Sequence, residues 1–161
     1  MNKRNLTILS LIVLAVITRL LPHPPNVAPI TAIALFGGCN IKDKNLALAL
    51  PLVCMFITDL FLGFHVIMPF VYISFMCISY IGISSKKINN GTILGSSLLF
   101  FLVTNLGVWY LGYPNTLAGL VSCYTLALPF FVNTIIGDLF FTHSLSYSFG
   151  KLKERYPVLS I

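Results

Sequence analysis

Polar and aromatic side chains stand in or beside the long apolar runs of this sequence, where an ionisable group is costly and marks a functional site by default. Ten of them are candidates to bind a small molecule: Arg19, His23, Asn26, Asp59, His65, Asn105, Trp109, Tyr113, Asn133 and Asp138. A guanidinium presents a planar fork of donors to an anion, and a carboxylate binds a cation or carries a proton. Amides orient a ligand and aromatic rings stack on it. These residue types favour substrate binding.

Each candidate also has an interpretation that needs no ligand. An ion pair with Asp59 or Asp138 explains Arg19 equally well, since an unpaired charge is costly inside a membrane. Histidines at a wet interface bond backbone groups, and asparagines bridge helices. Trp109 and Tyr113 fit the aromatic belt of a membrane interface. Both interpretations stay open, and the convergence of these residues at one depth favours binding.

The first three candidates lie at a break between two apolar segments, within residues 19–38. Three prolines occur within five positions, beside His23 and Asn26. Proline fixes its own backbone and disfavours the helical conformation in the residue before it, so one helix ends here and another begins. Irregular backbone at membrane depth is tolerated only where it is buried in protein or lines a wet cavity. The break therefore predicts a binding site.

The composition identifies an integral membrane protein. The chain has 161 residues, of which 57% are hydrophobic and 9% charged, and its mean hydropathy is +0.92. A soluble core cannot hide this much apolar surface. A spanning helix needs about 20 residues, which leaves room for about six spans and no soluble catalytic domain.

The apolar segments predict one all-α membrane domain over residues 1–161, with six transmembrane helices. The spans are expected at about 6–21, 27–41, 45–63, 66–83, 92–112 and 130–149. Residues 117–128 are apolar but too short to span, and Pro129 follows them. They predict a re-entrant or interfacial helix before the last span.

The basic residues predict the orientation of these spans. With six spans, nine of the ten Lys and Arg residues fall on one side: Lys3, Arg4, Lys42, Lys44, Lys86, Lys87, Lys151, Lys153 and Arg155. The positive-inside rule then gives a multi-pass protein of the inner (plasma) membrane with both termini cytoplasmic. The ten candidate residues fall near the outer face. The net charge of +6 follows from topology, and nucleic-acid binding is not expected.

Signatures of catalysis and metal binding are missing from the sequence. The four cysteines (Cys39, Cys54, Cys77 and Cys123) are scattered, with no CxxC motif. They are interpreted as small apolar packing residues. No nucleophile–base motif and no His-x-x-x-His spacing occurs. We expect no enzyme activity, no metal and no cofactor.

Seven motifs carry a family resemblance: RLLPHPPN at 19–26, LFGG at 35–38, DLFLGFH at 59–65, and the segments 97–109, 113–120, 123–131 and 133–139. They resemble a widespread group of uncharacterised small bacterial membrane proteins over nearly the whole chain. The first four spans more distantly resemble the substrate-binding S components of energy-coupling factor vitamin transporters. That resemblance implies a six-helix bundle with an outward site for a vitamin-like small metabolite. It also implies a transmembrane coupling subunit driven by cytoplasmic ATPases.

Two other functions compete with substrate binding. A non-catalytic assembly or scaffold subunit would use the charged residues only to lock helices together, and it predicts a self-paired cluster without a cavity. An intramembrane enzyme would use Asp59, Asp138 and the histidines as acid and base. In every case membrane lipid surrounds the helices.

Overall fold

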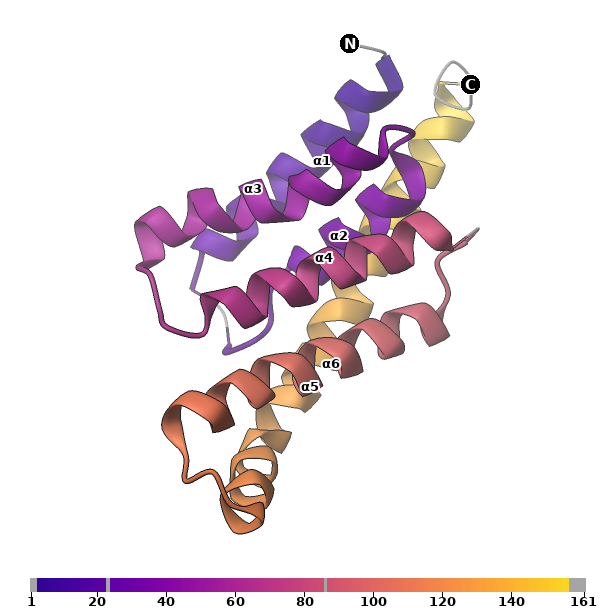
Figure 1. Cartoon of the computed structure of the whole chain (residues 1–161). Coiled ribbons are helices and arrows are strands. Elements are labelled where there is room, and N and C mark those ends of the chain that lie inside the picture. Colours follow the sequence, from indigo (N-terminus) through magenta and orange to yellow (C-terminus); the bar gives the residue numbers. More distant parts are fainter. Residues whose placement is uncertain (1–2, 23, 86, 157–161) are drawn as a thin grey trace.

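The computed structural model describes residues 3–22, 24–85 and 87–156, and the regular structure in these ranges is helical, with no strand. His23 and Lys86 lie outside the described residues. The helices are α1 (Lys3–Leu20), α2 (Ile30–Asn40), α3 (Lys44–Leu62), α4 (Met68–Ser84), α5 (Asn90–Gly112) and α6 (Leu117–Arg155) (Figure 1). The predicted all-helical class is confirmed.

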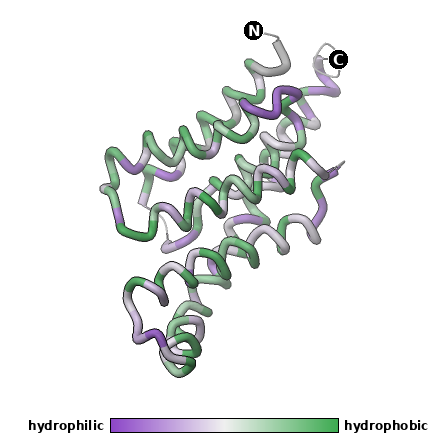
Figure 2. Tube along the Cα trace, viewed as in Figure 1, coloured by the Kyte–Doolittle hydropathy of each residue, from purple (hydrophilic) through white to green (hydrophobic). Residues whose placement is uncertain are grey.

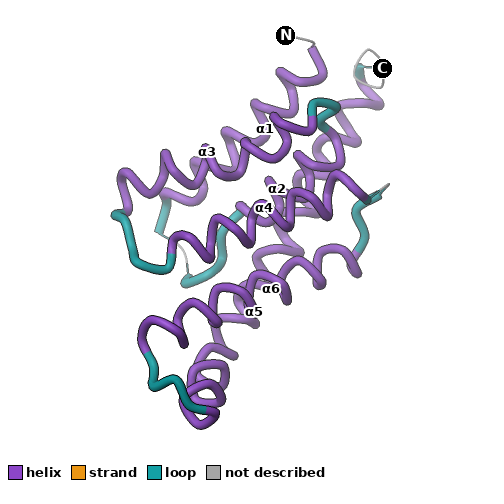
Figure 3. Tube along the Cα trace, viewed as in Figure 1, coloured by secondary structure: helices purple, strands orange, loops and turns teal. Residues whose placement is uncertain are grey.

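Successive helices run in opposite directions, which gives the bundle two distinct ends (Figures 1 and 3). Both chain termini and the α2–α3 and α4–α5 connections lie at one end. We call it the basic end because it carries these basic residues: Lys42, Lys44, Lys87, Lys151, Lys153 and Arg155. The α1–α2, α3–α4 and α5–α6 connections lie at the opposite end. Hydrophilic residues concentrate at the ends and apolar residues along the helices (Figure 2).

Three of the described helices, α3, α5 and α6, are long and apolar enough to cross a membrane. Large apolar side chains cover their outer surfaces; Phe61 of α3, for example, is 76% exposed. Such a surface is suited to lipid rather than to water. The chain thus has the properties of a membrane protein.

Helix α2 is shorter than the span expected at 27–41. It begins at Ile30, directly after Pro29, because the prolines before it hold the chain in a non-helical path. Its 11 residues rise about 16 Å, roughly half the hydrocarbon thickness of a bilayer. The other helix ends, apart from those of α6, differ from the predicted ones by at most three residues.

The boundary predicted at Pro129 is wrong. Residues 117–128 and 130–149 belong to one continuous 39-residue helix, α6, rather than to a short helix followed by a span. Proline removes one backbone donor, and neighbouring groups in a membrane bundle compensate for that loss. Phe101 of α5 packs against residues on both sides of Pro129: its ring centroid lies 5.5 Å from that of Tyr124 and 4.5 Å from that of Phe131.

Helix α2 forms the centre of the bundle. Its residues 30–38 are all buried, and it contacts each of the other five helices. Glycines bring α2 and α4 together: a Cβ atom on Gly82 would lie 2.7 Å from the Leu35 carbonyl oxygen, and one on Gly38 would lie 2.6 Å from that of Ser79. The two backbones therefore touch, as small residues allow in membrane helices.

This contact predicts a stability difference between two Gly→Ala variants. Gly82→Ala forces two backbones apart, and we expect overpacking to cost about 1–3 kcal/mol. Gly95→Ala is the matched control, because its added Cβ would have no atom within 4 Å other than those of its chain neighbours and its own helix backbone. The control is expected to gain up to about 1 kcal/mol of helix propensity. Thermal unfolding of the detergent-solubilised proteins measures both changes, and equal melting temperatures would contradict the close packing.

Candidate functional site

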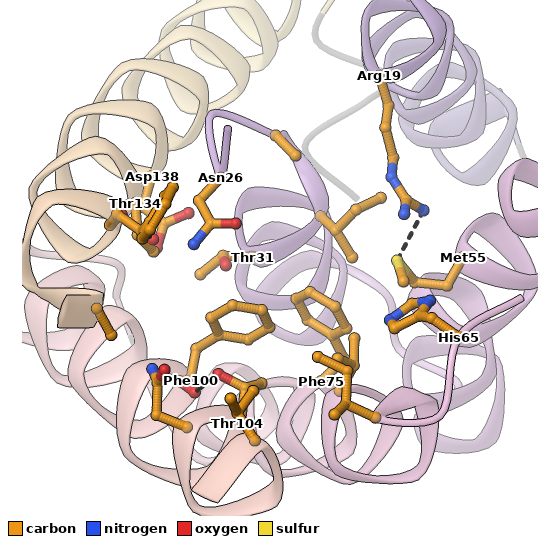
Figure 4. Close-up of a pocket in the computed structure, with 18 of the residues that line it drawn as sticks. Arg19, Asn26, Thr31, Met55, His65, Phe75, Phe100, Thr104, Thr134 and Asp138 are labelled. Carbon is orange, nitrogen blue, oxygen red and sulfur yellow. Dashed lines mark hydrogen bonds between the residues drawn. The ribbon is translucent and has the colours of Figure 1, made fainter. Parts of the chain in front are cut away.

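A cavity of about 510 Å³ lies at the end of the bundle opposite the basic end, and side chains from all six helices line it. Phe75 and Phe100 form an aromatic floor (Figure 4). Asp138 lies on one side of this floor, and Arg19 and His65 lie on the other. Among the residues that the structure describes, no three His, Cys, Asp or Glu side chains are close enough to hold a metal ion.

Most of the predicted site residues meet at this cavity. Of the nine that lie in the described part of the chain, six line it: Arg19, Asn26, His65, Asn105, Tyr113 and Asp138. The other three, Asp59, Trp109 and Asn133, are absent from its wall and bond neighbouring protein groups.

Arg19 docks α1 on α3. Its Nη2 lies 3.0 Å from Asp59 Oδ1, and its Nη1 donates to Thr58 Oγ1. Nη1 also donates to the Met55 sulfur (Figure 4). The Tyr72 hydroxyl donates to the second carboxylate oxygen of Asp59 at 3.1 Å. The Arg19 and Asp59 side chains are 13% and 2% exposed. Of the two ion pairs considered for Arg19, the structure therefore contains the one with Asp59. Arg19 also lines the cavity, where the Asp59 carboxylate balances its charge.

Asp138 has different surroundings. It is 2% exposed, and its Oδ2 accepts a 2.6 Å hydrogen bond from the Ser97 hydroxyl of α5. Within the described residues no Lys, Arg or His nitrogen lies within 4.0 Å of its carboxylate. Thr31 and Thr134 lie beside it in the wall (Figure 4). Asp138 is thus a buried carboxylate with a hydroxyl partner and no basic partner in this part of the chain.

The α1–α2 connection is held over the cavity by α6. Asn133 Nδ2 donates to the Pro25 carbonyl oxygen at 3.1 Å, and a Cβ atom on Gly137 would lie 3.1 Å from the Cα of Val27. Asn26 has a φ of 64°, a left-handed conformation that asparagine tolerates better than most residues. Asn133 therefore bridges backbone segments and positions Asn26, which lines the cavity.

Asn105 and Trp109 are separated by one helical turn and have different roles. Asn105 lines the cavity, and its Nδ2 donates to the Phe101 carbonyl at 2.8 Å. Trp109 Nε1 donates to the Pro114 carbonyl at 3.2 Å and so braces the α5–α6 connection. The shared helical face predicted for the two residues does not bring both to the site.

Sequence reasoning missed the apolar and hydroxyl residues of the wall. Phe75 and Phe100, whose ring centroids lie 5.1 Å apart, and Thr104 are examples. Phe and Thr are frequent in apolar helices, so their types alone do not mark a site. One signal was present: Phe100, Thr104 and Val108 recur every four residues, which puts them on one face of α5.

Residues 1–159 match a family of unknown function, DUF6580. The chain belongs to this family. No curated protein matches it, and no solved structure does. The DUF6580 description names no ligand or activity, so the resemblance to S components stays a prediction.

The Arg19–Asp59 pair predicts strong coupling in a double-mutant cycle of this DUF6580 protein. Arg19→Gln and Asp59→Asn should each cost more than about 1 kcal/mol, since each leaves a largely buried partner uncompensated. The double variant should lose clearly less than the sum. Chemical or thermal unfolding in detergent measures the cycle.

The Lys151–Glu154 pair is the matched control, with side chains 56% and 69% exposed. Exposed pairs contribute at most about 1 kcal/mol, so Lys151→Gln and Glu154→Gln should show little coupling. Additive effects at Arg19 and Asp59 would show that this pair does not attach α1 to α3.

Proposed function

We propose that this protein is a membrane-embedded substrate-binding component, similar to the S components of energy-coupling factor transporters, that captures a small nutrient. The cavity carries the proposal. Its volume of about 510 Å³ falls in the range of small-molecule pockets, about 300–1,000 Å³. Its wall combines an aromatic floor with a few polar groups, the usual composition of such pockets.

The arrangement of the two ends supports an outward-facing site. The positive-inside rule assigns the basic end to the cytoplasm, and the cavity lies at the other end. All six helices would then cross or enter the inner membrane, with both termini cytoplasmic. A site at the outer end suits a protein that collects a metabolite from outside the cell and passes it to a transmembrane coupling subunit with cytoplasmic ATPases. In this proposal the protein itself catalyses no reaction.

A scaffold role is the second candidate, and one observation favours it. Arg19 and Asp59 form a pair that links α1 to α3, as a helix-locking function requires. A scaffold, however, predicts that the polar cluster is entirely self-paired and that no cavity remains. The cavity and the Asp138 carboxylate, which has no basic partner among the described residues, favour substrate binding.

A ligand screen with one cavity-filling variant tests the proposed function. We expect at least one compound from a panel of water-soluble vitamins and small metabolites to raise the melting temperature, since a ligand at 100 times its Kd stabilises by about 2.7 kcal/mol. Ala127→Phe should abolish that shift, because Ala127 is buried in the cavity wall and the larger ring occupies the space.

Ala118→Phe is the matched control, since Ala118 is an exposed residue of the same helix that does not line the cavity. It should keep the full shift. A panel without any stabilising compound, or a shift that survives Ala127→Phe, would favour the scaffold role.

A further inference from the structure

We infer that the ligand of this cavity is an organic cation, with an ammonium or other cationic nitrogen bound at Asp138 and an apolar, planar body over the aromatic floor. The inference rests on the proposed binding function and names the chemical class of its substrate.

The distribution of charge around the cavity leads to this class. Arg19 and Asp59 neutralise each other, so their pair adds no net charge to the wall. Among the described residues Asp138 has hydroxyl partners, Ser97 and Thr31, and no basic side chain within 4.0 Å of its carboxylate. His65 is exposed and lies on the other side of the cavity (Figure 4). The described wall therefore carries one uncompensated carboxylate, and a buried carboxylate needs a partner to offset its desolvation.

The groups around Asp138 suit an ammonium ion. Asn26, Thr31 and Thr134 lie on the same side of the cavity as Asp138 (Figure 4). Their amide and hydroxyl oxygens can accept the further N–H bonds of an ammonium group, which has three donors. The carboxylate supplies the charge-assisted bond, the strongest kind available here.

The aromatic floor and the volume favour an organic cation over an inorganic one. A single water takes up about 30 Å³ of liquid, so a bare ion would leave most of the 510 Å³ cavity unfilled. Phe75 and Phe100 offer apolar area for a flat body, and the negative faces of their rings attract a cation. An anionic ligand fits less well because the guanidinium of Arg19 is already bonded to Asp59, Thr58 and Met55.

A tethered amine tests the charge of Asp138 without any ligand. Thr134 is 4% exposed, lines the cavity and precedes Asp138 by one helical turn, so Thr134→Lys brings an ammonium to the carboxylate. Thr134→Met is the neutral variant of similar length. We expect the Lys variant to melt no lower than the Met variant when Asp138 is present, and clearly lower in the Asp138→Asn background. Equal Lys-to-Met differences in melting temperature in both backgrounds would overturn the inference. Such a result is expected if Asp138 is protonated and therefore uncharged.

Matched probes test the same point by binding. Tryptamine, tryptophol and indole-3-acetate share one ring system and carry a cationic, a neutral and an anionic group; phenethylamine, phenethyl alcohol and phenylacetate form a second set. In a non-ionic detergent we expect the amines to bind most tightly, by calorimetry or thermal shift. Asp138→Asn should weaken amine binding by at least about tenfold. Asp43→Asn, which removes an exposed carboxylate at the basic end, should leave it unchanged.

The outcomes separate this inference from the proposed function. One outcome is that neutral or anionic compounds bind, with binding that Ala127→Phe abolishes and Asp138→Asn leaves unchanged. In that case the cavity binds a substrate but the cation inference is wrong. The inference is also overturned if neither amine binds while other compounds do. If no compound in any panel binds, the proposed function fails as well. Exchanging sodium chloride for potassium chloride at constant ionic strength should not displace the amines from the cavity.

Discussion

The structure depends on the late start of α2. Prolines up to Pro29 keep the chain out of the helical conformation, so the central helix begins at Ile30 and occupies only part of the bundle axis. Glycine contacts with α4 hold this short helix at the centre. Four of the residues that precede or begin it, Asn26, Ala28, Ile30 and Thr31, contribute to the cavity wall. The cavity thus lies where a longer central helix would have filled the bundle.

The two buried aspartates have different partners in the structure. Asp59 is satisfied by Arg19 and Tyr72, and this pairing attaches the otherwise loosely packed α1. Among the described residues Asp138 has hydroxyl partners and no basic partner, and it faces the cavity. The first carboxylate links α1 to α3, and the second is the group to which we assign the proposed ligand recognition. The helix-locking interpretation is therefore supported at Asp59, and ligand binding at Asp138 stays a proposal.

Much of the fold could be predicted because helix positions follow from local properties of the chain. Apolar runs, prolines and polar turns marked most helix ends to within three residues. The error at Pro129 arose because proline reports only a local backbone preference. The helix continues through that position, where Phe101 of α5 packs against Tyr124 and Phe131, and no local pattern contains these contacts.

The sequence by itself determined the all-helical class, the membrane-protein composition and the gathering of polar residues at one level. These features follow from the hydropathy of local segments and from the order of the charged residues between them. Only the tertiary structure decided that Arg19 pairs with Asp59, that Asp138 faces the cavity, and that Asn105 reaches it while Trp109 does not. The physical reason is that these helices are apolar on nearly every side. Their sequence pattern does not say which face turns inward, and packing against neighbouring helices sets that rotation.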